Sequence, residues 1–419
     1  MKKTIKLAVV AALALSATSA FATNGAALIG MGAEARGMAG TGIGIAHGAE
    51  SALTNPALIT SVEKTEISFG GTLFMPDVSN TNNVGAGVAS ADSAADMSMI
   101  PEVSLATKIN DNFYVGIGMW GTGGMGVDYR DTDSIVSDNT SAQMQMVTNL
   151  QLMQFGVPLA YTTNGFSIAI TPILQYGSLD INYEYPGSQN PQDPNAQGDT
   201  IGMGVAQDLK FGYNIGLAYE ISGFTVGAVY KSQIDMEYKG LDSVISPFTQ
   251  TGYKNNKLST PAEMGVGISY VMSEHTIAID YKNIKWSDAK GYQDFEWEDQ
   301  NVISVGYQYE TKGWALRAGY NYADSPISEQ TVVNPNTDVP NSAGLQPGTV
   351  NTFNLLGFPA IVTSHIALGG SYDISEQTSV DLAYTYAFEV TETFKNFAAQ
   401  DIKTTHSQSG VSAQINYNF

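Results

Sequence analysis

The chain has 419 residues, a formal net charge of −21 and no cysteine. Its acidic balance argues against nucleic acid as a partner, and the missing cysteine excludes disulfides, thiolate metal sites and cysteine nucleophiles. Glycine and aromatic residues abound, with 43 Gly, 22 Tyr and 16 Phe, while only 14% of the residues are charged. This composition favours strands and tight turns over amphipathic helices.

Residues 1–22 have the pattern of a secretory signal peptide. Three lysines precede the apolar run 7–15, and residues 20–22 (AFA) offer a small-x-small cleavage site. The run is too short to cross a bilayer as a helix, and no later stretch holds about 18 uninterrupted apolar residues. Such an exported chain is periplasmic, secreted or an outer-membrane barrel. Without the signal peptide it carries 16 basic against 40 acidic side chains.

Residues 23–64 are rich in glycine and alanine and show no period of two. Such a segment ahead of a barrel is either a disordered extension or a plug inside the lumen. Its apolar content is too high for a solvated tail, which favours the plug. The apolar residues in question are Leu28, Ile29, Met31, Ile43, Ile45, Leu53, Leu58 and Ile59.

Residues 65–419 predict strands joined alternately by short turns and long polar connections. This alternation is typical of outer-membrane barrels, whose periplasmic turns are short and whose outer loops are long. The six expected short turns are 110–112, 163–165, 221–223, 273–275, 311–313 and 375–377. The seven longer connections lie near 77–99, 121–143, 184–210, 239–259, 287–299, 324–362 and 391–406. Together these connections predict an all-β, transmembrane antiparallel β-barrel of about 14 strands.

The strands alternate apolar and polar side chains, as lipid on one face and a wet lumen on the other require. In residues 314–322, Trp314 and Leu316 are expected to face lipid, whereas Arg317 faces the lumen. A charge on the lipid face would cost roughly 2–4 kcal/mol at mid-membrane depth. The pattern places four charges on the inner face: Asp280, Lys282, Arg317 and Asp381.

The last strand alternates to the end of the chain. Val411, Ile415 and Phe419 fall on one face, with Ser412 and Gln414 among the residues on the other. To close the wall, this strand must pair with the first, near residues 65–74.

Several motifs resemble the FadL/TodX family of outer-membrane transporters for fatty acids and other hydrophobic compounds. The most specific are Ala35 to Gly42 (ARGMAGTG) and Thr54 to Ile59 (TNPALI). Further similarity lies in residues 260–263 (TPAE), 286–288 (WSD), 314–320 (WALRAGY), 325–326 (SP) and the aromatic last strand. The resemblance implies a 14-stranded barrel plugged by an N-terminal hatch, located in the outer membrane of a Gram-negative bacterium.

The resemblance also implies a route for a hydrophobic ligand. It would be captured in an extracellular groove, pass to a pocket in the lumen and leave through a gap in the barrel wall. The third and fourth extracellular loops, here 184–210 and 239–259, would build the groove. Both hold apolar residues that a solvated loop does not need: Ile201, Met203, Val205 and Leu209 in one, Leu241, Val244, Ile245 and Phe248 in the other. The alternative interpretation is that these residues only pack the two loops together.

Candidate residues of the hatch are Arg36 and the segment Asn55, Pro56 and Ala57. We expect Arg36 to pair with a lumen carboxylate such as Asp280 or Asp381. The alternative is that Arg36, Lys282 or Arg317 contacts a fatty-acid carboxylate. The Asn-Pro pair favours a turn that fixes the hatch against the wall.

Two places in the wall are candidates for the lateral exit. By resemblance, an inward kink belongs in the third strand, where Gly116 and Gly118 are the flexible points. Pro158 and Pro172, at similar distances from the turn 163–165, mark a rival site because neither residue can donate a backbone hydrogen bond. Alternatively, the two prolines mark only two ordinary bulges in the wall.

Three functions compete: passive uptake of hydrophobic molecules, a general or polar-solute porin, and, more remotely, an outer-membrane hydrolase. About forty residues available to plug the lumen favour uptake over an open porin. The histidines lack metal spacing and no Gly-x-Ser-x-Gly elbow occurs, so we expect no enzyme, no cofactor and no metal. The expected partners are a hydrophobic small molecule, outer-membrane lipids and lipopolysaccharide, with the protein acting as a monomer.

Overall fold

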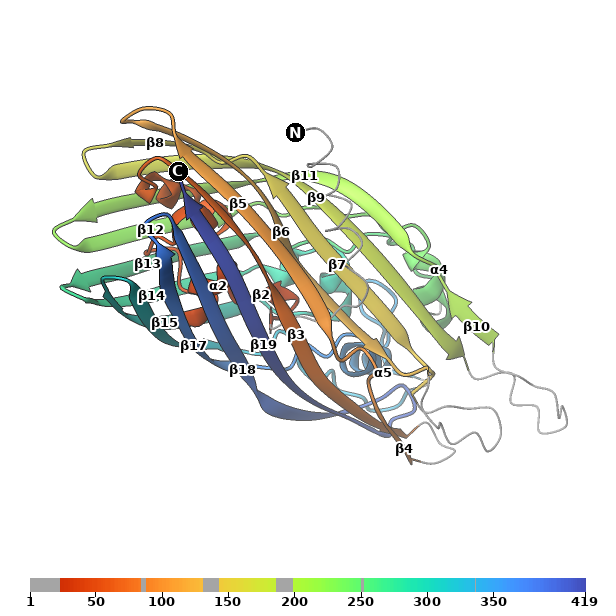
Figure 1. Ribbon diagram of the computed structural model, residues 1–419. Coiled ribbons are helices and arrows are strands. Elements are labelled where there is room, and N and C mark those ends of the chain that lie inside the picture. The colour runs from red at the N-terminus through yellow and green to blue at the C-terminus, as the bar shows by residue number, and fades with distance from the viewer. Residues whose placement is uncertain (1–22, 84–87, 131–142, 186–198, 250–251, 336) are drawn as a thin grey trace, which may run out of the picture.

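A computed structural model describes residues 23–83, 88–130, 143–185, 199–249, 252–335 and 337–419. The expected signal peptide, residues 1–22, lies outside this described part. Most of the described chain forms one antiparallel sheet that closes into a barrel (Figure 1). Within it, no helix is long and apolar enough to cross a membrane.

The wall consists of 14 strands in the described residues, as the sequence predicted. Closure is made by the last strand, β19, which pairs along its length with the first, β3, from Asn418↔Glu66 to Ile402↔Asn82. The strands are β3 (Thr65–Asn83), β5 (Ser98–Lys108), β6 (Phe113–Asp128), β7 (Val147–Gly156) continued by β8 (Leu159–Thr163), β9 (Phe166–Tyr185), β11 (Ala206–Ile221), β12 (Phe224–Lys231), β13 (Glu263–Met272), β14 (His275–Ile284), β15 (Gln300–Thr311), β16 (Trp314–Ala323), β17 (Ser364–Ser375), β18 (Thr378–Lys395) and β19 (Asp401–Asn418). Two short strands, β4 (Val88–Asp92) and β10 (Asp199–Gly202), extend the pairing beyond the wall on β3 and β9.

The six short turns lie where the sequence placed them, between β5 and β6, β8 and β9, β11 and β12, β13 and β14, β15 and β16, and β17 and β18. Four of them contain residues with positive φ, and in two of these both turn residues do, Asn164-Gly165 and Ser222-Gly223, which suits the tight hairpins of a right-twisted sheet. Four of the seven long connections are shorter than expected, because the strands beside them continue past the apolar belt, whereas the connection after β12 is longer, 232–262 instead of 239–259. The last connection spans only residues 396–400 rather than 391–406.

Short helices occupy the long connections at one end of the barrel: α4 (Leu241–Ile245), η3 (Ser246–Phe248), η4 (Trp286–Asp288), η5 (Tyr292–Phe295), α5 (Pro347–Thr352) and η6 (Phe353–Gly357). Figure 1 shows α4 and β10 at the end of the barrel opposite the C-terminus. Along β16, Leu316 is 57% exposed on the outer face, whereas the neighbouring Arg317 is 6% exposed inside. The expected separation of lipid and lumen faces is therefore present.

The N-terminal segment lies inside the barrel (Figure 1). It contains β1 (Thr23–Asn24), β2 (Ala27–Leu28), α2 (Gly32–Gly37), η1 (Gly48–Glu50), α3 (Ser51–Thr54) and η2 (Pro56–Ser61). Its apolar residues, such as Ile29, Ile43, Leu53 and Leu58, are buried. Burying them against the inner wall offsets the entropy of ordering a glycine-rich chain. The interpretation as a plug is confirmed, and the disordered alternative is wrong.

Candidate functional site: a plugged lumen and its apolar cavity

The first anchor of the hatch is the buried pair Arg36–Glu102. Arg36 lies in α2 and donates from Nη1 and Nη2 to the two carboxylate oxygens of Glu102 on β5, at 2.8 and 2.5 Å. Glu102 also accepts from the backbone N–H of Gly32 at 3.0 Å. The expected partners Asp280 and Asp381 were wrong, because the register of α2 places Arg36 beside a different lumen carboxylate.

Asp280 on β14 instead holds the hatch through its backbone. Its carboxylate accepts from the N–H groups of Gly42, Ile43 and Gly44 at 2.7, 2.8 and 3.3 Å. Ser269 on β13 donates to the Gly44 carbonyl at 2.6 Å. Gly44 lies so close to the wall that a Cβ there would collide with the backbone of Gly267 and Ile268. This loop therefore rests directly on the wall.

Arg317 links the hatch to two wall strands. It lies 3.1 Å from Glu34 of α2 and 3.9 Å from Asp381 on β18, and it also donates to Gln308 on β15 at 2.6 Å. Arg317 is thus paired both with the plug and with Asp381, and Asp381 also accepts from Ser371 and Asn416 of the wall. The buried charges of Arg317 and Asp381 are therefore compensated.

Asn55 joins two parts of the hatch to the wall. Its Nδ2 donates to the Ile43 carbonyl at 2.8 Å and to the Leu217 carbonyl of β11 at 3.0 Å. Its Oδ1 accepts from the N–H of Ala57 at 3.1 Å and caps η2, in which Pro56 is the first residue. The predicted turn at Asn55-Pro56 is thus a helix start that also contacts the wall.

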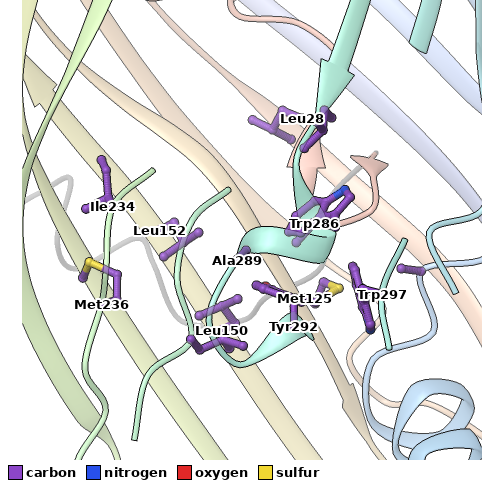
Figure 2. Close-up of a cluster of buried hydrophobic side chains, with 14 of the residues drawn as sticks. Leu28, Met125, Leu150, Leu152, Ile234, Met236, Trp286, Ala289, Tyr292 and Trp297 are labelled. Atoms are coloured by element: carbon purple, nitrogen blue, oxygen red, sulfur yellow. The ribbon is translucent and has the colours of Figure 1, made fainter. Parts of the chain in front are cut away.

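A cavity of about 70 Å³ lies between the hatch and the wall. Leu28, Met31 and Leu53 border it on the hatch side, and Trp286 and Tyr292 border it from the loop after β14. Figure 2 shows Leu28, Trp286 and Tyr292 in an apolar cluster with residues of β6, β7 and the segment after β12. Arg36, Lys282 and Arg317 do not line this cavity; the cation that does is Lys231, paired with Glu263 at 2.7 Å. No sequence motif marks Lys231, because it stands at the end of a strand with ordinary alternation.

Six of the eight expected groove residues cluster at the loop end of the main apolar core. Val244 and Ile245 of α4 are buried, and Ile201, Met203 and Phe248 pack against the same core. The Phe248 ring lies 5.4 Å from that of Tyr183 and 5.0 Å from that of Phe353. Leu241 is buried in the same helix. The two loops therefore pack together through these residues.

The other two expected groove residues lie apart from this cluster: Val205 in the loop ahead of β11, as expected, and Leu209 in β11 itself, where a loop was wrongly expected. Val205 and Leu209 are 64% and 56% exposed and do not join this cluster. Leu209 belongs to β11, which begins at Ala206, and its side chain lies on the outer face of the wall. The expected loop ran to residue 210, whereas the strand already begins at Ala206.

The two candidate wall sites lie side by side instead of competing. The N–H of Gly116 on β6 donates to the carbonyl of Pro158 at 2.9 Å, and the N–H of Val157 donates to that of Pro172 at 3.3 Å. The strand is interrupted between Gly156 and Leu159, so both prolines belong to one irregularity. Gly118, one of the two expected flexible points, pairs with Gly156 beside it.

Trp120 fills this irregularity from inside. Its ring packs over Gly118, and a Cβ on Gly156 would lie 3.1 Å from its Cζ3. The side chain is 1% exposed and donates from Nε1 to Ser104 at 2.8 Å. Sequence reasoning missed Trp120, although two glycines beside a tryptophan were the available signal.

A closed 14-stranded wall, an internal plug and an apolar cavity define an outer-membrane transport barrel. The family model for the outer membrane protein transport proteins (OMPP1/FadL/TodX) matches residues 7–343. The chain belongs to this family, whose members are transport proteins of the outer membrane for hydrophobic compounds, and are not enzymes.

Curated relatives and solved structures agree. The chain is 26% identical over 448 residues to a long-chain fatty acid transport protein of Escherichia coli O6:H1, covering 92% of this chain and 95% of that protein. It is 25% identical to the corresponding protein of Escherichia coli O157:H7, over 83% and 89% of the two chains. Its fold is similar to a FadL homologue of Pseudomonas aeruginosa, with a TM-score of 0.72, 15% identity and coverage of 94% and 100%. Its fold is also similar to the toluene transporter TodX of P. putida, with a TM-score of 0.68, 18% identity and coverage of 93% of this chain and 99% of that chain.

Proposed function

We propose that this protein takes up long-chain fatty acids or hydrocarbons passively across the outer membrane. Residues 1–22 are a signal peptide, residues 23–64 the hatch and residues 65–419 the barrel, and the protein acts as a monomer among outer-membrane lipids and lipopolysaccharide. The apolar cavity between hatch and wall carries the proposal, since an apolar ligand gains roughly 25 cal/mol per Å² of apolar surface buried there. The relatives named for fatty acid and toluene transport support the ligand class.

The size of the cavity requires a gating movement. Its volume is about 70 Å³, whereas an apolar cavity that binds benzene measures about 150 Å³. Even a single aromatic ring therefore needs the hatch or the segment after β12 to move. Purified protein with a labelled fatty acid should show a slow binding phase, limited by this movement; binding at the diffusion limit would contradict it.

Capture is assigned to the apolar cluster of Ile201, Met203, Val244, Ile245 and Phe248. Phe248 is half-buried at the edge of the cluster, so a ligand arriving at the loops can reach it. Phe248→Asp should lower uptake of labelled fatty acid at least tenfold while the barrel keeps its heat-resistant migration. Val339→Asp is the matched control, because Val339 is 84% exposed in another loop. Equal uptake by the two variants would refute the capture site.

Release is assigned to the wall irregularity formed by Gly116, Gly118, Pro158 and Pro172. Trp120 closes this irregularity on the lumen side, since its ring covers Gly118 and Gly156. Trp120→Ala should open the wall and raise the rate at which a bound fluorescent fatty acid leaves for surrounding liposome lipid. Trp314→Ala, on the lipid face of β16, is the control. A release rate unchanged by Trp120→Ala would exclude this exit.

Single-channel conductance separates uptake from the porin alternative. The hatch anchors at Arg36, Asn55 and Asp280 hold the lumen plugged, so the wild-type protein should carry almost no ion current. A large, stable current through the wild-type protein would favour the porin.

A further inference from the structure

One seam of the wall is incomplete on the side of the long loops. β12 pairs with β11 from Ile221↔Phe224 only as far as Asn214↔Lys231. β11 itself continues to Ala206 along β9. Over residues 206–213, β11 therefore has a strand neighbour on one side alone in the part of the chain that the structure describes. We call the space beside this edge the β11 notch.

The chain turns inward where β12 stops. Ile234, Met236 and Tyr238 are all at most 3% exposed. Ile234 pairs with Thr260 ahead of β13 instead of with β11. The segment 232–236 thus lies behind the notch, inside the line of the wall.

The notch lies within the apolar part of the outer surface. Leu209, Phe211 and Tyr213 face outward, and Phe211 is 81% exposed. Their cross-strand partners on β9 are Tyr176, Leu174 and Pro172, so the outer surface beside them is also largely apolar. Lipid is therefore the solvent that this edge meets.

An open sheet edge in lipid is costly, because its backbone groups find no partner. Ser232 satisfies Tyr213: its N–H donates to the Tyr213 carbonyl at 2.9 Å, and its Oγ accepts from the Tyr213 N–H at 3.0 Å. Residues two apart point their backbone groups to the same side, so those of Phe211 also point into the notch. Such an edge is tolerated at membrane depth where it lines a cavity.

A cavity does reach the notch. The cavity between hatch and wall is bordered by Tyr213, Lys231 and Ser232, as well as by Leu28 and Leu53 of the hatch. Tyr213 is an outward-facing residue, so the cavity extends to the plane of the wall here. Ile234 narrows the passage, since its Cδ1 lies 2.5 Å from the position of a Cβ on Gly212.

We propose that the β11 notch is a side entrance through which apolar compounds dissolved in the outer leaflet reach the cavity. Passage opens when the segment 232–236 swings away from β11. This entrance is separate from the wall irregularity at Trp120. The class of ligand that uses it is taken from the proposed function. It would admit molecules that never meet the apolar cluster of the loops.

A reversible cross-link tests the entrance. In Gly212→Cys/Ser232→Cys, the new Cβ at 212 lies 3.0 Å from the position of the Ser232 Oγ, a spacing that suits a disulfide. The chain has no other cysteine. Oxidation should lower uptake of a labelled fatty acid supplied in the outer leaflet at least tenfold, and reduction should restore it. Leu217→Cys/Ala228→Cys, which joins residues already paired below the notch, should be indifferent to oxidation.

A second measurement does not depend on transport. Ile234→Cys in liposomes should react with a membrane-dissolved pyrenyl maleimide, as the outward Leu217→Cys does, whereas Ala49→Cys in the hatch should not. Labelling of Ile234→Cys without wild-type uptake would keep the entrance and refute the proposed function. Wild-type uptake that is insensitive to a disulfide confirmed by mass, with Ile234→Cys unlabelled, would overturn the entrance and leave the proposed function standing.

Discussion

Asp280 is the side chain whose loss should most directly free the hatch. Asp280→Ala removes the acceptor of three buried N–H groups, those of Gly42, Ile43 and Gly44. Hydrogen bonds to a charged group contribute about 1.5–3 kcal/mol each, so the three together would contribute about 4.5–9 kcal/mol if they were additive. Removing the carboxylate also relieves the cost of burying a charge, which lowers the expected net loss to about 3 kcal/mol.

A loss of about 3 kcal/mol raises the fraction of open hatch roughly 100-fold, at 1.4 kcal/mol for each factor of ten. The strand pairing of the wall is untouched, so the barrel should keep its heat-resistant migration. Hydrogen exchange of the peptide covering residues 42–44, followed by mass spectrometry in detergent, measures the opening directly. Single-channel recording should show new current steps at the same time.

The matched control is Asp294→Ala. The Asp294 carboxylate accepts hydrogen bonds from the Tyr253 hydroxyl and from Asn255 Nδ2, each at 2.7 Å, and all three residues belong to the long loops. This variant should leave exchange at residues 42–44 unchanged. If Asp280→Ala also exchanged at the wild-type rate, the carboxylate would not hold the hatch and the reasoning would fail.

Three further predictions concern the anchors and the loops. Arg36→Met leaves Glu102 buried without its partner and should destabilise hatch docking by about 3–5 kcal/mol, measured by urea titration. The double variant Arg36→Met/Glu102→Gln should regain at least half of the lost stability, and a double variant as unstable as Arg36→Met would argue against the pair. Gly44→Ala places a methyl group against the backbone of Gly267 and Ile268, so it should raise single-channel current. Gly204→Ala should not, because the strain at its φ of +63° falls in a loop where no atom lies within 4 Å of the new Cβ. Burial alone would raise the pKa of Asp235, but hydrogen bonds from Lys290, Gln233 and Ser259 outweigh it and lower the pKa to about 2. Because the folded pKa lies below the unfolded value of 3.8, this contribution is present above about pH 4 and is lost as the pH falls toward 2; proteolysis of the loop 232–260 should therefore accelerate between pH 4 and 2, and Asp235→Asn should remove that acceleration.

Much of the barrel was predictable because its rules are local. Side chains alternate along every strand, and the two environments differ so strongly that a slip of one residue would place Arg317 in lipid. The short turns were equally clear, since Asn164-Gly165 and Ser222-Gly223 suit two-residue hairpins. Strand ends were less predictable, because the alternation continues beyond the membrane, and so Leu209 was assigned to a loop.

The site was less predictable because it depends on contacts between distant segments. Any of several lumen carboxylates is chemically suited to Arg36, and only the placement of α2 selects Glu102, 66 residues away. Gly116 and Pro158 were treated as rival sites, although the pairing of β6 with β8 makes them neighbours. Trp120 was overlooked because its importance lies in the two glycines that its ring covers.

The sequence by itself determined the container: an exported chain, an even-numbered barrel closed by its last strand, and an N-terminal segment too apolar to be a tail. These follow from periodicity and composition, which solvent imposes residue by residue. The tertiary structure alone decided how the plug is held, where the cavity lies and which seam of the wall is incomplete. Such features depend on the register and length of strands relative to their neighbours, as when β12 stops at Lys231 while β11 continues, and no local pattern encodes that difference.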